Sequence, residues 1–222
     1  MRRSHETDTV APFFTADTLD RATPESFTIS LTLKSESWID WVARSESSAL
    51  YFIKPTSPYP HYSYKGFEFY QYGGLWNTQW QRGTSVYDVH IRYGPREAES
   101  IRILTGENST FNPNGKLYIT HDPKEFGLGY VALASAELSL TLSQAFNVTP
   151  IGACTFTMSQ CAGSPIVTCD NADGAVIYLK EVEQPDQTAV ILNGNCMTIQ
   201  GNKEELMRAA DKVIWIWYGI IK

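Results

Sequence analysis

The sequence lacks any long run of apolar residues. Its longest, residues 213–221, is about half of the roughly 20 residues that a transmembrane helix needs, and it contains Gly219. Residues 1–6 include two arginines, but no apolar segment follows them, so they do not resemble a signal peptide. We therefore expect no membrane span in this chain. Its location is then either cytoplasmic or set by a targeting or anchoring segment upstream of residue 1.

The sequence also lacks an excess of basic residues. It has 18 Lys and Arg against 24 Asp and Glu, which gives a formal net charge of −6. Proteins that bind nucleic acid neutralise its phosphates with clusters of Lys and Arg. The charge balance therefore indicates that nucleic acid is not a partner.

The common catalytic motifs are absent. There is no G-x-S-x-G, H-E-x-x-H, P-loop or G-x-G-x-x-G pattern. Two acid–imidazole groupings exist, Asp88 with His90 and His121 with Asp122, and neither has an identifiable third catalytic group. We interpret both as surface pairs and expect no cofactor. An enzyme, such as a hydrolase, is the least favoured class.

Metal-binding patterns are weak. No C-x-x-C pair is present and the four histidines are scattered, which argues against a zinc site. Residues 170–174 resemble the start of a calcium loop, but Cys169 stands at the first ligand position and Lys180 at the last. We therefore predict a plain turn there and no metal site.

Four cysteines lie in the last third of the chain, at Cys154, Cys161, Cys169 and Cys196. An even number in a stretch rich in Gly, Ser, Thr and Pro favours two disulfides over four free thiols. We expect Cys161–Cys169 to close a small loop and Cys154–Cys196 to tie that loop to a later strand. The sequence leaves the other two pairings open. Disulfides favour an extracellular or cell-surface location over a cytoplasmic one.

Apolar residues alternate with polar ones along most of the chain, which predicts mainly β-strands. Residues 1–24 are polar and are interpreted as a tail or linker. Strands are expected at 27–34, 49–53, 67–71, 86–92, 100–104, 117–120, 175–180, 188–192 and 196–200. Residues 136–144, with leucine at every second position from Leu138, are also assigned to a strand. A helix beginning near Val131 is the alternative for this segment.

The spacing of the apolar residues changes after Asn202, from every second residue to helical spacing. Leu206, Ala210, Val213 and Trp217 recur at helical spacing, with Asn202 as the expected N-cap and a glutamate three residues later. The sequence therefore predicts an amphipathic helix over 203–221. The expected fold class is α+β, mainly β, with antiparallel, sandwich-like sheets and this one C-terminal helix packed on the sheet. Residues 25–222 are expected to form a single domain. The alternative is a subdivision near 150 that sets off a disulfide-bearing strand–helix unit, 151–222.

Aromatic residues crowd the segment 51–93. Tyr59, Tyr62 and Tyr64 lie among Pro, His and Ser residues typical of a loop, and Trp76 and Trp80 follow. Exposed flat rings can stack on sugars or anchor a protein interface, so these five residues are the candidate ligand-binding set. The alternative is that the rings pack over a sheet and fill the core.

Two N-x-[ST] patterns begin at Asn108 and Asn147, both beside expected turns. They are candidate glycosylation sites if the protein is exported.

The C-terminal part of the chain has a strand that contains a cysteine, then a glycine, then an amphipathic helix. The residues that carry this order are 166–172, 176–180, 195–201 and 206–214. This order over about 150–222 resembles exported domains of uncharacterised archaeal proteins. The resemblance implies a cell-surface domain held by a membrane segment, with no catalytic residues. We therefore expect a non-enzymatic extracellular or cell-surface structural or adhesion domain whose partners are glycans or other surface proteins. The alternative function is a carbohydrate- or peptide-binding module that uses the aromatic segment 51–93.

Overall fold

The computed structural model describes residues 43–46, 49–52, 58–124 and 128–222. Contacts between residues divide the chain into two units, Met1–Pro58 and Tyr59–Lys222. In the first unit, β1 (Ala43–Glu46) and β2 (Ala49–Phe52) pair as an antiparallel hairpin. The predictions of a tail over 1–24 and a strand over 27–34 lie outside the described residues.

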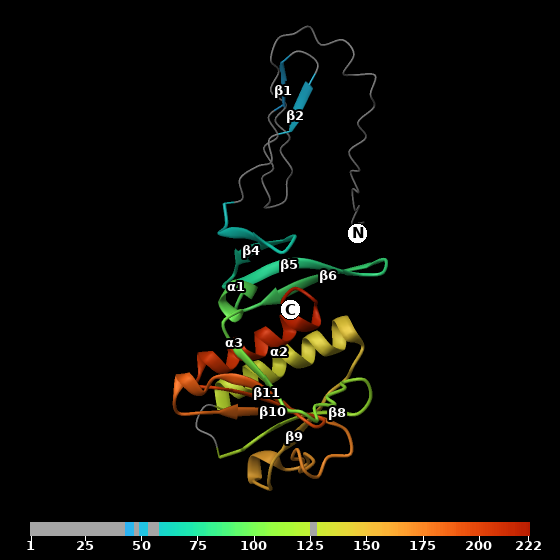
Figure 1. Ribbon diagram of the computed structural model, residues 1–222, viewed down its shortest axis with the longest axis vertical. Coiled ribbons are helices and arrows are strands. Elements are labelled where there is room, and N and C mark those ends of the chain that lie inside the picture. The colour runs from blue at the N-terminus through green and yellow to red at the C-terminus, as the bar shows by residue number, and fades with distance from the viewer. Residues whose placement is uncertain (1–42, 47–48, 53–57, 125–127) are drawn as a thin grey trace, which may run out of the picture. The chain divides into compact units, whose positions relative to one another are not determined.

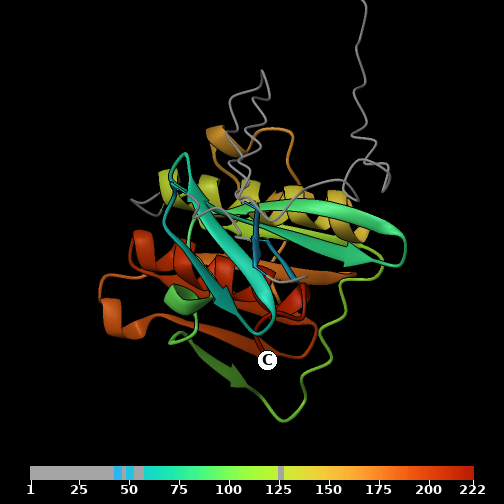
Figure 2. The ribbon, with the colours of Figure 1, turned by 90° about the horizontal axis from the view of Figure 1, so that it is seen from above.

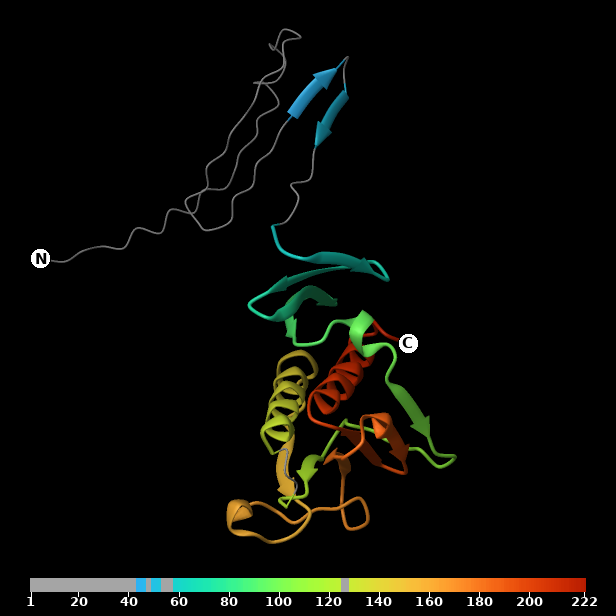
Figure 3. The same ribbon diagram turned by 90° about the vertical axis from the view of Figure 1, so that its left-hand side faces the viewer.

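The second unit is built from two sheets with helices between them (Figures 1 and 3). The four-stranded sheet has the order β3-β4-β5-β6, formed by β3 (His61–Tyr64), β4 (Phe67–Tyr72), β5 (Leu75–Arg82) and β6 (Ser85–Ile91). The six-stranded sheet has the order β7-β11-β12-β10-β8-β9, formed by β7 (Arg102–Thr105), β8 (Leu117–His121), β9 (Ile151–Cys154), β10 (Ala175–Glu181), β11 (Ala189–Asn193) and β12 (Cys196–Gly201). The helices are α1 (Pro95–Ala98), α2 (Leu128–Phe146) and α3 (Glu204–Trp217).

The predicted fold class, α+β and mainly β with a C-terminal helix packed on the sheet, is confirmed. The four-stranded sheet is wholly antiparallel. The larger sheet is mixed, because β11 and β12 pair antiparallel whereas all its other neighbouring strands pair parallel. Parallel neighbours need a crossover connection, and α2 supplies it between β8 and β9.

The prediction of a strand over 136–144 is wrong, because these residues belong to α2. Leu138 and Leu142 are buried one helical turn apart, whereas Leu140 between them is 57% exposed. Val131, Ala134 and Ala145 complete the buried face at helical spacing. The leucines at every second position resembled one face of a strand, but two of them are buried on the helix and the one between them is exposed. The helix that was considered as the alternative is the structure that forms.

Helix α3 is buried on nearly all sides because it lies between the two sheets and beside α2. Leu206 and Ile214 are fully buried in the main core. Trp215 is also fully buried, and its ring meets Phe69 of the four-stranded sheet edge-on at 5.5 Å. Figure 2, which looks down on the four-stranded sheet, shows its strands lying over both long helices. Helix α3 is thus the element on which the two sheets are assembled.

The start of α3 differs from the expected N-cap. The helix begins at Glu204, and the Asn202 side chain donates to the carbonyls of Val182 and Glu183 at 2.9 and 3.0 Å. Asn202 therefore ties α3 to the end of β10. The cause is the tight passage from β12 into α3, in which Lys203 takes a positive φ of 49°.

Gly201 makes this passage sterically possible. A Cβ there would lie against the Leu206 backbone nitrogen and 2.6 Å from the Glu205 carbonyl carbon. Gly201→Ala is expected to lower the free energy of unfolding by about 1–3 kcal/mol, because backbone atoms must shift to admit the methyl group. Gly152→Ala is the control, since nothing lies within 4 Å of the added carbon. Equal urea midpoints for the two variants would contradict the prediction.

The four cysteines form two disulfides, but the predicted pairing is wrong. The bonds are Cys154–Cys161 and Cys169–Cys196. Cys154 ends β9 and Cys196 begins β12, with β8 and β10 between them in the sheet. Three strand spacings amount to about 14 Å, whereas bridged Cα atoms lie within about 7 Å.

The disulfides indicate an oxidising compartment. In the part of the chain that the structure describes, no helix has the length and apolar character to span a membrane.

Candidate functional site

The outer face of the four-stranded sheet carries a polar surface that its inner face does not. Side chains alternate between the two faces along each strand. The inner set packs against the helices and includes Phe69, Val89 and Ile91, all nearly fully buried. The outer set is mostly polar and solvent-exposed. The outer face is therefore the surface that this sheet offers to a partner.

Two rows of side chains cross this outer face from β3 to β6. The first row consists of His61, Tyr70, Asn77 and His90, and the second of Ser63, Glu68, Gln79 and Asp88. The register places the first row's residues directly opposite one another across neighbouring strands, and it pairs Ser63 with Glu68 and Gln79 with Asp88 in the second row. Side chains opposite one another on neighbouring strands are close enough to interact. The rows lie side by side because their members are two residues apart on every strand.

Hydrogen bonds and ring contacts within the rows fix the side chains. His90 Nδ1 and Asn77 Oδ1 lie 2.5 Å apart, and the His61 ring stacks on Tyr70 with centroids 5.9 Å apart. Asn77 Nδ2 also donates to the backbone carbonyls of Tyr70 at 3.1 Å and Leu75 at 2.8 Å. A surface held in this way loses little side-chain entropy when it binds a ligand.

The second row has the same organisation around its two carboxylates. Ser63 Oγ donates to Glu68 Oε1 at 2.5 Å, and Gln79 Nε2 donates to Asp88 Oδ1 at 3.1 Å. The second oxygen of each carboxylate accepts no hydrogen bond from the residues that the structure describes. Both oxygens are thus acceptors for a ligand.

A shallow cavity of about 460 Å³ lies over the part of the two rows that β4, β5 and β6 contribute. Its lining includes Glu68, Tyr70, Gln79, Asp88 and His90. The cavity therefore combines the aromatic residues Phe67 and Tyr70 with carboxylate and amide acceptors and with the imidazole of His90. Such a set suits a ligand rich in hydroxyl groups.

An aromatic pair stands at one end of this face. Tyr59 and Tyr72 meet edge-on with ring centroids 5.1 Å apart, and they are 44% and 61% exposed. Tyr72 lies two residues after Tyr70 on β4 and so points to the same side of the sheet. Of the five predicted aromatic residues, Tyr59 is the one on the exposed face.

The other four predicted aromatic residues, Tyr62, Tyr64, Trp76 and Trp80, lie half-buried against the main core. Trp76 Nε1 donates to Glu97 at 2.6 Å, and Trp80 Nε1 donates to the Tyr218 carbonyl at 2.9 Å. Burial raises the pKa of the Tyr62 hydroxyl to about 12. All four rings pack against the main core on the inner side of the sheet, so they hold the sheet on the helices and do not form a common exposed surface with Tyr59.

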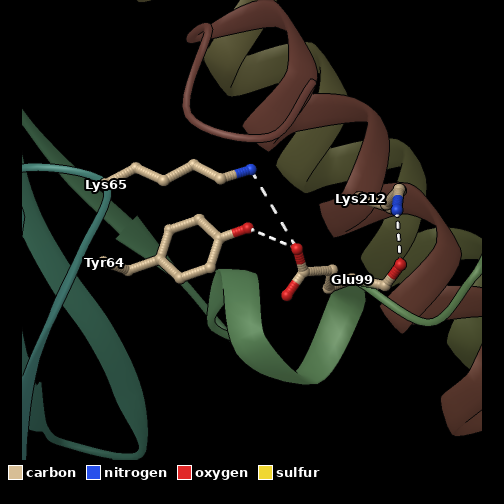
Figure 4. Close-up of polar contacts among 4 residues, drawn as sticks. All are labelled: Tyr64, Lys65, Glu99 and Lys212. Atoms are coloured by element: carbon tan, nitrogen blue, oxygen red, sulfur yellow. Dashed lines mark hydrogen bonds and ion pairs between the residues drawn. The ribbon is translucent and has the colours of Figure 1, made fainter.

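Glu99 fixes the end of the four-stranded sheet to the helix layer (Figure 4). Its Oε1 accepts from the Tyr64 hydroxyl at 2.9 Å and lies 4.0 Å from Lys65 Nζ. Its backbone carbonyl accepts from Lys212 Nζ of α3 at 2.7 Å. Glu99, the residue that follows α1, thus joins the β3–β4 turn to α3. These contacts hold the outer face at a fixed position.

The predicted acid–imidazole groupings have different environments. Asp88 and His90 lie exposed on β6, each within one of the two rows. His121 is half-buried at the end of β8, and burial lowers its pKa although Asp122 opposes the shift. Among the described residues, His121, Cys154 and Cys161 are the group with atoms close enough to hold a metal, within 4.8 Å. Both sulfurs belong to a disulfide, so the group does not fit a metal centre in this state.

The predicted modification and turn residues are placed at the surface. Asn108 and Asn147 are both exposed. Asn147 has a positive φ of 57° just after α2, and the Val148 amide donates to Leu142 at 2.9 Å, which closes the helix end. Residues 170–174 form part of a turn region, in which Thr168 N donates to Asn171 Oδ1 at 2.7 Å.

Sequence reasoning missed Glu68, Tyr70, Asn77 and Gln79 as candidate site residues. The available signal was the spacing of Asp88 and His90, which placed them on one strand face. Only the pairing of four strands shows that six further side chains continue that face.

Comparison of the chain with protein-family models, with curated proteins and with solved structures finds no significant match.

Proposed function

We propose that this protein is a non-enzymatic extracellular or cell-surface adhesion domain that binds carbohydrate on the outer face of strands β3–β6. The observation that carries the proposal is the pair of hydrogen-bonded rows across this sheet. Sugar hydroxyl groups both donate and accept, so they match the carboxylate oxygens, amides and imidazoles of the rows. The Tyr70 ring supplies a flat surface for the apolar face of a sugar.

The charge of the face favours a neutral glycan. Glu68 and Asp88 both accept hydrogen bonds and repel sulfate, phosphate and uronate groups. Both carboxylates also lie on an open surface that does not exclude water. Exclusion of water strengthens the electrostatic interactions of an active site, so an open face suits reversible binding better than acid–base catalysis. The two disulfides support an extracellular setting, and glycans on Asn108 and Asn147 belong to the same proposal.

The test is binding of a panel of neutral and anionic oligosaccharides, measured by calorimetry. We expect a neutral member to bind, and Glu68→Gln and Asp88→Asn each to weaken its binding about 10-fold or more, because hydrogen bonds to charged groups contribute about 1.5–3 kcal/mol. Tyr70→Ala is expected to have a similar effect through lost stacking.

The matched control is Glu183→Gln, which makes the same chemical change at an exposed residue outside the four-stranded sheet. Circular dichroism should give the wild-type spectrum for every variant. Binding of no glycan in the panel, or binding that all three face variants leave unchanged, would refute the proposed site.

A further inference from the structure

The segment 155–174 covers part of the outer face of the six-stranded sheet. It leaves the sheet at β9 and returns at β10. Thr120 Oγ1 donates to the Val167 carbonyl at 2.8 Å, and the Tyr118 hydroxyl donates to Asp173 at 2.8 Å. Val167 also packs with Tyr118 and Val176 in a small second core. The segment is thus held on the sheet by a few contacts and by the two disulfides.

The two disulfides differ in their exposure to solvent. Cys154 and Cys161 are 3% and 4% exposed, which places both sulfurs of their bond inside the protein. Cys169 is exposed, although its partner Cys196 is 6% exposed. The Cys169–Cys196 bond therefore has one end at the surface, whereas the other bond has none.

A cleft of about 350 Å³ lies beside the exposed bond. Cys169, Cys196 and Asp170 line it, together with Asn193 and Asn195 of the β11–β12 turn. Its volume admits a molecule of a few heavy atoms. Thiol–disulfide exchange requires direct attack of a thiolate on a disulfide sulfur, so access decides which bond reacts.

We propose that Cys169–Cys196 is an exchangeable disulfide that a low-molecular-weight thiol opens from this cleft, while Cys154–Cys161 stays closed. The thiolate of the small molecule forms a bond to Cys169 Sγ, and the Cys169–Cys196 bond breaks. The electron pair of that bond leaves on Cys196 Sγ, which takes a proton from water. The product is a mixed disulfide on Cys169 and a free thiol at the start of β12.

The lining of the cleft selects among small thiols. Asp170 is adjacent to the attacked residue and carries the one charged side chain of the lining, whereas Asn193 and Asn195 are neutral. A carboxylate attracts an ammonium group and repels a sulfonate. The favoured reagent is therefore a cationic aminothiol.

Opening this bond removes one covalent anchor of the segment 155–174. The anchor at β9 persists through Cys154–Cys161, and at the other end Asp173 still accepts from Lys116 and Tyr118. Val167 stays on Tyr118 and Val176, because its amide donates to the Cys154 carbonyl at 2.9 Å and its carbonyl accepts from Thr120.

The experiment uses the oxidised, native protein and needs no variant that disturbs folding. It is treated with cysteamine or with 2-mercaptoethanesulfonate at equal thiolate concentration, quenched with acid, alkylated and mapped by mass spectrometry. We expect Cys169 to acquire the small-thiol adduct and Cys196 to become alkylated at least 10-fold faster than Cys154 and Cys161 are modified. In 6 M guanidinium chloride this difference should disappear, because both bonds are then equally accessible.

Asp170→Asn tests the choice of thiol. Cysteamine should open the bond about three- to tenfold faster than the sulfonate in the wild type, and the variant should bring the two rates together. A preference that persists in the variant would overturn the role of Asp170. Opening of both disulfides at equal rates in the native protein, or of Cys154–Cys161 first, would overturn the exchangeable bond itself.

Discussion

Replacing Trp215 by alanine is expected to lower the free energy of unfolding by about 3–5 kcal/mol. The side chain is fully buried, and it contacts both the helix layer and Phe69 of the four-stranded sheet. Its indole Nε1 donates to the Tyr93 carbonyl at 2.8 Å, so the change also leaves a buried acceptor without its donor.

Trp217→Ala provides the matched control, since it removes the same side chain two residues later on α3. Trp217 is half-buried and meets Phe146 at a ring distance of 6.4 Å. We expect a loss of at most about 2 kcal/mol for this variant. Urea unfolding followed by far-UV circular dichroism measures both without relying on tryptophan fluorescence. Equal losses for the two variants would show that α3 is not assembled between the sheets as described.

Replacing Asp211 by asparagine is expected to raise stability at neutral pH and to remove a pH dependence. Asp211 lies fully buried on α3, where its Oδ2 accepts from the Tyr93 amide at 2.8 Å. Burial raises the pKa of its carboxyl well above the ordinary range, and the neighbouring Glu137 carboxyl of α2 raises it further. Arg92, whose Nε lies 3.5 Å from Glu137 Oε1, opposes the shift.

The direction of the pH effect follows from the raised pKa. Between the unfolded pKa of about 3.9 and the higher folded value, the folded protein keeps a proton that the unfolded chain releases. The protonated Asp211 carboxyl therefore makes its full contribution to the free energy of unfolding below about pH 4. This contribution is lost as the pH rises through the folded pKa. The slope within that window reaches about −1.4 kcal/mol per pH unit.

Asparagine keeps the acceptor for the Tyr93 amide and can donate to Glu137, but it does not titrate. We expect Asp211→Asn and the wild type to have similar stability near pH 4 and to diverge up to the folded pKa, with the variant more stable. Urea titrations at several values from pH 4 to 8 measure this difference. Asp211→Ala is the control for the hydrogen bond, because it leaves the Tyr93 amide unpaired at every pH. Parallel stability curves for the wild type and Asp211→Asn would refute the assignment.

The outer face of the four-stranded sheet illustrates what sequence reasoning could not supply. The expected strands at 67–71 and 86–92 correspond to β4 and β6. Strand β5 was not predicted, because its apolar alternation is interrupted by the buried Thr78 on the inner face. Without β5 the two rows have no centre, so Asn77 and Gln79 could not be connected to Asp88 and His90.

The pairing of the cysteines is a second feature that sequence reasoning could not supply. The number and placement of cysteines predicted two disulfides, and two disulfides form. Their pairing depends on how many strands separate β9 from β12, which is a property of the sheet order. Sequence separation gave no information on that order, and the predicted Cys154–Cys196 bond spans two intervening strands.

By itself, the sequence determined the features that depend on local patterns. These are most strands of the second unit and the C-terminal helix with its apolar residues from Leu206 to Trp217. Side chains two residues apart share a face on a strand, and those three or four apart share a face on a helix, so a clear period reports the element directly. The tertiary structure alone decided that α3 lies between two sheets, that Asp211 is buried beside Glu137, and that polar residues from four strands form one surface. Each of these depends on contacts between residues far apart in the chain, which local patterns do not encode.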